Sequence, residues 1–205
     1  MVDKTTNNKL KIISLFRSNY LAQYHVREMA KLTKKSHVTL LPHLKALEND
    51  KIIIPKTIVK NKAYSLNFDN IVTRSYILLA ETVKSIVYLE DIFLIKKVTA
   101  EILNLNLDGI IILFGSYAKQ TFQEDSDIDL FYLGKITDAE IEKIKAIGKT
   151  YGKIINVKKS TLRNFETGLR KKDPLTIEII KNHLLLQNSE QFIGALWRYY
   201  NAIRT

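Results

Sequence analysis

The stretch from Ile110 to Leu133, which reads IIILFGSYAKQTFQEDSDIDLFYL, constrains the fold of this chain more than any other. It begins with an apolar run that ends at Gly115-Ser116. After a ten-residue spacer come Asp127 and Asp129, followed by a second apolar run. This order predicts a strand, a tight Gly-Ser turn, a short helix, a loop and a second strand.

The two aspartates predict a metal site. Side chains alternate between the two faces of a strand, so Asp127 and Asp129 point the same way while Ile128 points into the core. Two carboxylates on one face suit a hard divalent cation such as Mg²⁺, which keeps several waters and binds substrate phosphates.

The Gly-Ser turn predicts a phosphate site next to that cation. Glycine allows a sharp turn at Gly115 and a close approach of the backbone to a ligand, and the following helix offers unpaired N–H groups to an anion. Ser116 adds a hydroxyl group, and Lys119 adds a positive charge one turn further on. The stretch therefore predicts phosphoryl or nucleotidyl transfer from a nucleoside triphosphate.

Gly115-Ser116 and Asp127-Ile128-Asp129, with the flanks FGSYAK and SDIDLF, resemble the signature of the DNA polymerase β nucleotidyltransferase superfamily, most of all its minimal nucleotidyltransferases. The resemblance implies that the Gly-Ser turn grips the triphosphate, with ATP the expected nucleotide, and that the aspartates hold Mg²⁺. The alternative is that residues 125–127 serve only as turn and strand-entry residues. Asp129, on the same face inside an apolar strand, argues against it.

A third strand is predicted over Lys153 to Val157. In most active members of the superfamily this strand carries a third acidic residue, which acts as base for the attacking hydroxyl; here the position is Asn156. An asparagine can offer an oxygen to a metal, but it has no negative charge and takes no proton. Glu124 and Asp125, in the preceding loop, are an alternative source of a carboxylate. Gln120 stands where related sequences often carry glycine.

The net charge of +11 is concentrated near the N-terminus. Residues 1–66 hold thirteen Lys and Arg and four Asp and Glu, against nineteen and seventeen in residues 67–205. Such asymmetry is typical of a nucleic-acid-binding module, although a solvated lysine-rich surface has the same composition. The chain has no cysteine and no long uncharged apolar run. We therefore expect a cytoplasmic protein without disulfides, thiolate metal sites or membrane spans.

Residues 1–66 predict three helices and a hairpin. Apolar residues over Leu10 to Phe16 and Val26 to Leu32 indicate two helices, and Ser36 is the expected N-cap of a third that ends near Asn49. Strands follow at 51–59 and 62–66, joined by a turn at Lys60-Asn61. The pattern resembles a winged helix-turn-helix domain, with LTKKSHVTLLPHLKALENDKII similar to its recognition-helix segment.

This second resemblance implies that residues 1–66 bind duplex DNA. The residues that it places against phosphates and base edges are Lys34, Lys35, His37, Thr39 and His43 around the third helix and Lys60 and Lys62 on the wing. The alternative is a protein-docking or dimerisation module, since such folds are reused in that way.

The fold class predicted is α/β, of the α+β type. It comprises a winged helix-turn-helix domain at 1–66, a helical connector at 67–104, and at 105–205 a nucleotidyltransferase fold with a small mixed sheet flanked by helices. The connector's dense apolar residues predict two helices that are buried on more than one side. They pack either against the catalytic domain or in a homodimer interface. Asp138 is the expected cap of a helix over 139–147.

Two functions from different classes fit these features. The first is an enzyme that transfers a nucleoside monophosphate to a hydroxyl of a protein or nucleic acid. In the related minimal nucleotidyltransferases this activity often makes an antitoxin that modifies a HEPN-type toxin partner. The second is a DNA-binding regulator whose nucleotidyltransferase fold has lost turnover and senses nucleotides or docks a partner. Modification of a small molecule, as in aminoglycoside-inactivating relatives, is a third alternative that leaves the basic N-terminal third without a use.

Overall fold

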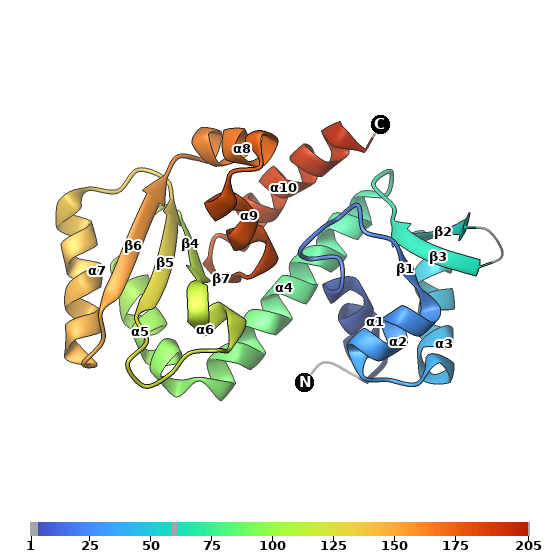
Figure 1. Cartoon of the computed structure of the whole chain (residues 1–205), viewed down its shortest axis with the longest axis horizontal. Helices are drawn as coiled ribbons and strands as arrows, with labels where there is room; N and C mark the ends of the chain where they lie inside the picture. Colours follow the sequence, from blue (N-terminus) through green and yellow to red (C-terminus); the bar gives the residue numbers. More distant parts are fainter. Residues whose placement is uncertain (1–3, 59–60, 205) are drawn as a thin grey trace. The chain divides into compact units, whose positions relative to one another are not determined.

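The computed structural model describes residues 4–58 and 61–204, which divide into two compact units (Figure 1). Unit 1 comprises residues 1–81 and 196–205, and unit 2 comprises residues 82–195. The division falls inside helix α4 (Ile71–Asp91), between Glu81 and Thr82. The expected connector at 67–104 is thus two helices, α4 and α5 (Phe93–Leu103), but it is shared between the units instead of linking them.

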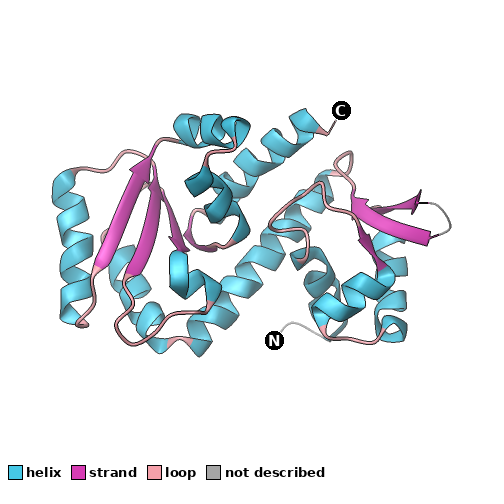
Figure 2. Cartoon of the chain, in the orientation of Figure 1, coloured by secondary structure: helices cyan, strands magenta, loops and turns pink. Residues whose placement is uncertain are grey.

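The described residues of unit 1 up to Leu66 form three helices and a small antiparallel sheet (Figure 2). The elements are α1 (Lys4–Ser14), β1 (Tyr24–His25), α2 (Val26–Thr33), α3 (His37–Asn49), β2 (Ile53–Ile58) and β3 (Asn61–Leu66), followed by the start of α4. The strands lie in the order β1-β3-β2. Ser36 caps α3 as predicted, since its hydroxyl accepts a hydrogen bond from the Thr39 N–H at 3.1 Å.

Two expectations for unit 1 were wrong in detail. The first helix ends at Ser14, so Leu15 and Phe16 lie in the following turn, although Phe16 is fully buried and packs edge-on against Tyr24. Of the hairpin turn expected at Lys60-Asn61, Lys60 lies outside the described residues, and Asn61 belongs to β3 because it pairs with Ile58.

The core of unit 1 is closed by one buried ion pair and by aromatic residues from both ends of the chain. Arg17 Nη2 lies 2.5 Å from Glu81 Oε2, with side chains 10% and 1% exposed. From α10 (Ser189–Ile203), Trp197 stacks on Phe68 and Tyr200 on Tyr20. Burial raises the pKa of Tyr200 to about 12, so its hydroxyl stays neutral at physiological pH.

Unit 2 is built on a four-stranded mixed sheet in the order β6-β5-β4-β7. Strand β5 runs parallel to β6 and antiparallel to β4, and β7 is antiparallel to β4. The remaining elements are β4 (Ile110–Phe114), α6 (Gly115–Lys119), β5 (Ile128–Leu133), α7 (Asp138–Thr150), β6 (Ile155–Ser160), α8 (Leu162–Lys171), α9 (Pro174–Lys181) and β7 (Leu184–Gln187). The strand, turn, short helix, loop and strand predicted over 110–133 are confirmed.

The two faces of this sheet have different coverings (Figure 1). One face carries alternate residues such as Leu113, Leu130 and Ile155 into a core shared with α5 and α7. On the other face Phe131 packs against Phe165 of α8, with ring centroids 6.0 Å apart. The aspartate motif lies on this second face, since Asp129 is two residues from Phe131 along β5.

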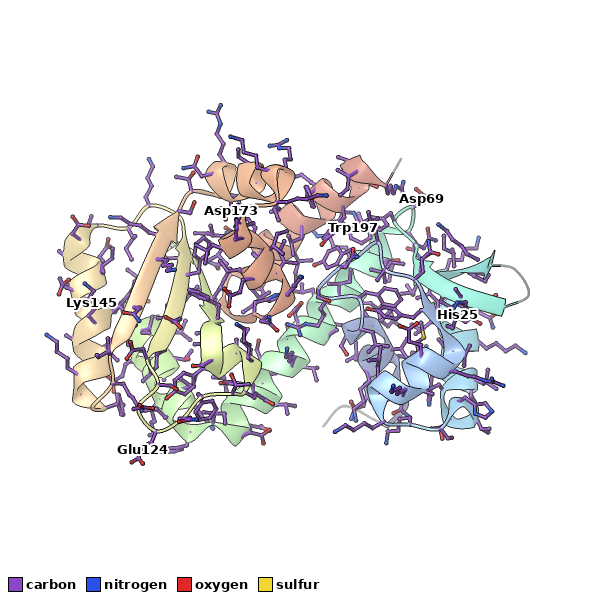
Figure 3. The ribbon with its side chains drawn as sticks, viewed as in Figure 1. His25, Asp69, Glu124, Lys145, Asp173 and Trp197 are labelled. Atoms are coloured by element: carbon purple, nitrogen blue, oxygen red, sulfur yellow. The ribbon has the colours of Figure 1, made fainter. Side chains whose placement is uncertain are left out.

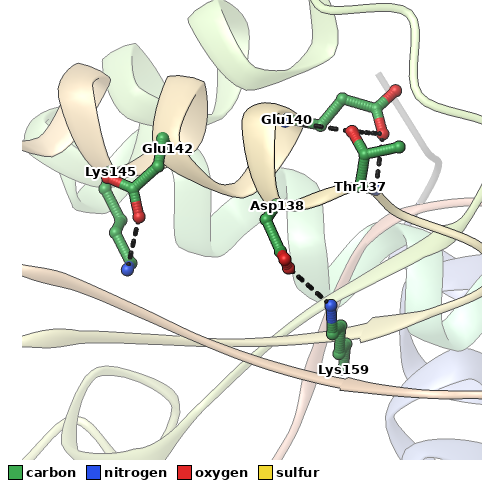
Figure 4. A network of polar contacts seen from close by, with 6 residues as sticks. All are labelled: Thr137, Asp138, Glu140, Glu142, Lys145 and Lys159. Atoms are coloured by element: carbon green, nitrogen blue, oxygen red, sulfur yellow. Dashed lines mark hydrogen bonds and ion pairs between the residues drawn. The ribbon is translucent and has the colours of Figure 1, made fainter.

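The start of α7 and the extent of β6 differ from the predictions. Thr137, not Asp138, caps α7: its hydroxyl accepts from the Glu140 N–H at 3.2 Å, and the Glu140 carboxylate accepts from the Thr137 N–H in return (Figure 4). Asp138 instead pairs with Lys159 at 2.8 Å, and this lysine lowers the pKa of its carboxyl. Strand β6 spans 155–160 instead of 153–157, because it pairs in parallel with β5 as far as Leu133. Within the described residues, no helix is long and apolar enough to cross a membrane.

Candidate nucleotidyl-transfer site

Asp127, Asp129 and Asn156 converge at the ends of two neighbouring strands. Asp129 and Asn156 are direct partners in the β5–β6 ladder. The side-chain amide of Asn156 donates to Asp127 Oδ2 at 3.2 Å and to Asp129 Oδ1 at 3.3 Å. Both carboxylates therefore face the same amide nitrogen, which is the convergence that the strand alternation predicts.

Gly115 brings the turn after β4 against this pair. The preceding residue, Phe114, pairs with Asp129 across the β4–β5 ladder. Gly115 has φ of +69°, and a Cβ placed on it would lie 2.2 Å from Asp129 Oδ2. Both the backbone conformation and the space allow only glycine here. The proposed phosphate-gripping turn and the carboxylate pair are thus in direct contact.

Buried aromatic residues hold the short helix α6 in position. Tyr117 is 1% exposed and stacks on Phe122, with ring centroids 4.3 Å apart. The hydroxyl of Tyr88 donates to the Tyr117 carbonyl oxygen at 2.8 Å, and burial raises the pKa of Tyr88. α6 ends at Gln120, whose φ of 58° is left-handed. Related sequences often carry glycine at this position, and the left-handed backbone conformation is the physical reason for that preference.

Lys119 does not stand free beside the Gly-Ser turn. Its ammonium group lies 2.6 Å from Glu178 Oε1 of α9, and both side chains are partly exposed. No short-range pattern connects these two residues, which are 59 positions apart in the chain. A triphosphate would have to draw Lys119 away from Glu178 to use its charge.

The carboxylates of the site fit one hard cation, whose remaining ligands would be water and substrate phosphates. In the described part of the chain, no group of three or more His, Asp and Glu side chains gathers as a metal cage. Asp127 and Asp129 supply two converging carboxylates, which suits Mg²⁺ bound jointly with water and substrate phosphates. Glu124, expected as a compensating carboxylate, is exposed and points away from the sheet (Figure 3). Asp125 is likewise exposed in the loop.

An open pocket of about 830 Å³ lies further along the same face of the sheet, and none of Asp127, Asp129 and Asn156 lines it. Its floor includes Phe131 of β5 and Lys158 of β6, and its walls come from α8, α9 and the turn between them. The sequence analysis missed this pocket. The available signal was the pair of basic runs at Lys158-Lys159 and 170–172, but only the packing of α8 and α9 brings them together.

The residues predicted to contact DNA lie in different environments. Lys34, Lys35 and His37 are exposed at the corner between α2 and α3, with Lys34 in the left-handed conformation that ends α2. Thr39 is exposed, but its hydroxyl lies 2.8 Å from the hydroxyl of the capping residue Ser36. Lys45, on the exposed side of α3, was not among the predicted residues.

His43 and Lys62 each have a partner within unit 1. His43 is not an exposed contact residue, since its Nε2 lies 3.0 Å from Asn8 Nδ2 of α1 and the ring is half-buried. Lys62 pairs with Glu48 at 2.9 Å, and this hydrogen bond is the main cause of its raised pKa. Lys60 lies outside the described residues.

One comparison with known protein families matches the part of the chain that holds the site. Residues 91–191 match the family described as "Polymerase beta, Nucleotidyltransferase". With the fold and the convergent carboxylates, the match supports assignment of this part of the chain to the nucleotidyltransferase superfamily.

No curated protein matches the chain. Among solved structures, a chain of "Crystal structure of the toxin-antitoxin with AMP-PNP" is 18% identical, with a TM-score of 0.35, over 50% of this chain and 85% of that chain.

Proposed function

We propose that unit 2 is a Mg²⁺-dependent nucleotidyltransferase that moves a nucleoside monophosphate, with ATP as the expected donor, to a hydroxyl acceptor. The observation that carries the proposal is the convergence of Asp127 and Asp129 on one point, in contact with the turn at Gly115. That arrangement matches the requirement of nucleotidyl transfer, in which catalysis is mainly positioning and charge neutralisation.

In the proposed reaction the triphosphate lies on the Gly115-Ser116 turn, with its α-phosphate beside the carboxylates. The acceptor oxygen forms a bond to the α-phosphorus, and the bond from that phosphorus to the bridging oxygen breaks, so pyrophosphate leaves with the electron pair. The acceptor's proton passes to water, because Asn156 takes no proton. Asp127 and Asp129 would hold Mg²⁺, which would neutralise the phosphate charge.

The first test is transfer of label from α-³²P ATP with Mg²⁺ by the wild type and by the double variant Asp127→Asn with Asp129→Asn. We expect the variant to lose at least about 100-fold in rate, because the phosphate charge is no longer neutralised. Asp138→Asn is the matched control, since this carboxylate pairs with Lys159 near the start of α7 instead of joining the site. Equal transfer by the wild type and the double variant would contradict the proposal.

The second candidate is a DNA-binding regulator whose nucleotidyltransferase domain has lost catalytic turnover. Asn156 in place of an acidic residue favours loss of turnover. The elements α1 to β3 fit a winged helix-turn-helix domain, and Lys34, Lys35 and His37 form an exposed, basic corner at the start of α3. Tight, Mg²⁺-dependent ATP binding without transfer to any acceptor would favour this regulator.

Partners remain predictions that come from the family resemblance. A HEPN-type toxin would serve as the acceptor in an antitoxin role, and duplex DNA would bind residues 1–66. A homodimer would use apolar side chains of α4 such as Leu79 and Ile86, which are 49% and 51% exposed.

A further inference from the structure

The outward face of helix α3 is apolar over its first two turns. The buried side of the helix consists of Leu40, Leu44 and Leu47. The exposed residues on the opposite side follow the helical spacing i, i+3, i+4 and i+7, and they are Val38, Leu41, Pro42 and Lys45. Val38 is 64% exposed and Leu41 is 48% exposed. Two large aliphatic side chains on one stripe of α3 thus have no cover within the chain.

The surroundings of this apolar stripe are basic. No aspartate or glutamate occurs between Glu28 and Glu48, and the lysines of that stretch are Lys31, Lys34, Lys35 and Lys45. All four lysines are exposed. A symmetric contact between two copies of the chain would bring these like charges together, whereas a polyanion is attracted by them. The charge therefore favours duplex DNA over a second copy as the partner of this face.

The polar side chains of α3 offer little direct reading of base edges. Arginine, asparagine and glutamine recognise guanine and adenine through paired hydrogen bonds, and none of them occurs in residues 37–48. The hydroxyl of Thr39 lies 2.8 Å from that of Ser36. The ring of His43 is half-buried, with its Nε2 3.0 Å from Asn8 Nδ2. Apolar contact is thus the main means of base recognition that the start of α3 retains.

The major groove of DNA presents an apolar group at one base only, the 5-methyl group of thymine. In a recognition helix, the residues near the N-terminus are those that contact base edges, and Val38 and Leu41 lie in the first two turns of α3. Burial of one methyl group against an aliphatic side chain corresponds to about a fourfold gain in affinity.

We propose that Val38 and Leu41 recognise thymine methyl groups, so that unit 1 prefers duplex DNA with A·T pairs beneath the start of α3. Lys34 and Lys35 contact phosphates, which adds affinity for every sequence alike. The inference rests on the proposed binding of duplex DNA by residues 1–66, and it names the base that is selected and the side chains that select it.

The test compares four short duplexes of equal length that differ in the methyl group. Their repeating pairs are A·T, A·U, G·5-methylcytosine and G·C, so the methyl group is removed from an A·T sequence and added to a G·C sequence. Fluorescence anisotropy measures binding of the full chain at one salt concentration. We expect each methylated duplex to bind about 15-fold more tightly than its unmethylated counterpart, because two methyl groups become buried.

Val38→Ala with Leu41→Ala should abolish this methyl preference and leave binding to the A·U and G·C duplexes unchanged. Both side chains are exposed, and alanine is a good helix former, so α3 should be retained. The matched control is Ile71→Ala with Val72→Ala, which removes two exposed apolar side chains from the start of α4. This control variant should keep the methyl preference of the wild type.

Lys34→Ala with Lys35→Ala separates the inference from the proposed function. This variant should weaken binding to all four duplexes by the same factor and keep the methyl preference, because it removes phosphate contacts alone. Equal binding of methylated and unmethylated duplexes by the wild type would overturn the inference while DNA binding stands. A methyl preference that survives Val38→Ala with Leu41→Ala would do the same.

Absence of binding to every duplex at low salt would remove the DNA-binding proposal and this inference with it. Sedimentation velocity of the wild type and of the Val38→Ala, Leu41→Ala variant would then be decisive for the face. A change of oligomeric state in the variant would identify the outward face of α3 as an interface between copies of the chain.

Discussion

Asn156 determines which chemistry the carboxylate pair supports. Its identity and its place on a third strand were predicted from the sequence, because strand alternation and the family pattern locate the position. The sequence does not reveal that the amide donates to both Asp127 and Asp129. That contact depends on the register of the parallel β5–β6 pair, which no local pattern encodes. The amide thus bridges the two carboxylates.

Asn156→Asp tests this reading at the residue scale. The new carboxylate removes two hydrogen bonds and adds a third negative charge beside Asp127 and Asp129, so Mg²⁺ should bind more tightly. It also supplies a group that takes a proton, and we expect transfer to rise by about 100-fold. Isothermal titration with Mg²⁺ and single-turnover transfer measure the two effects.

Asn156→Ala is the control, because it removes the hydrogen bonds without adding a base. Its transfer rate should not rise. If the aspartate and alanine variants have the same rate and the same Mg²⁺ affinity, position 156 has no part in the chemistry.

At the scale of the element, the short helix α6 was predicted from the Gly-Ser turn and is present over Gly115–Lys119. The backbone strain at its end follows from Gln120, which adopts φ of 58° as the C-cap. A side chain in this left-handed conformation costs about 1–2 kcal/mol, which glycine avoids. The pairing of Lys119 with Glu178 was not predictable, because it requires the position of α9.

Gln120→Gly should stabilise unit 2. The relief of the left-handed strain exceeds the added entropy of the unfolded chain, and the net gain expected is about 0.5–1 kcal/mol. Urea unfolding followed by a probe in unit 2 measures it.

Gln123→Gly is the matched control in the same loop, because Gln123 has an ordinary negative φ and glycine there should be neutral or destabilising. Equal destabilisation by both variants would show that the conformation at Gln120 carries no strain.

At the scale of the whole molecule, the proposed functions fall in different units. The basic character of the first 66 positions was recognised from charge asymmetry, and DNA binding by the exposed residues Lys34, Lys35 and His37 stays a prediction. The winged-helix resemblance could not show that His43 contacts α1 or that Lys62 pairs with Glu48, because both contacts depend on tertiary structure. The division between the compact units falls inside α4, where a continuous helical pattern contains no signal for it.

Lys34→Ala with Lys35→Ala should weaken duplex DNA binding and reduce the slope of log affinity against log salt by about 2, because two phosphate contacts are lost. Fluorescence anisotropy over a range of salt concentrations measures this. ATP binding by unit 2 should be unchanged. The pair Lys143→Ala with Lys149→Ala removes the same charge from α7 and should leave the slope as it is. No measurable affinity of the wild type for duplex DNA at low salt would remove the DNA-binding proposal.

The ion pair between Lys119 and Glu178 has a consequence for selectivity among anions. A nucleotide bound at the Gly-Ser turn competes with Glu178 for one ammonium group, and partly exposed pairs of this kind contribute about 0–1 kcal/mol. Glu178 thus competes with the nucleotide for the ammonium group of Lys119. A highly charged triphosphate displaces Glu178 more readily than a monophosphate does. The protein would then discriminate against free nucleoside monophosphates that compete with the triphosphate for the turn.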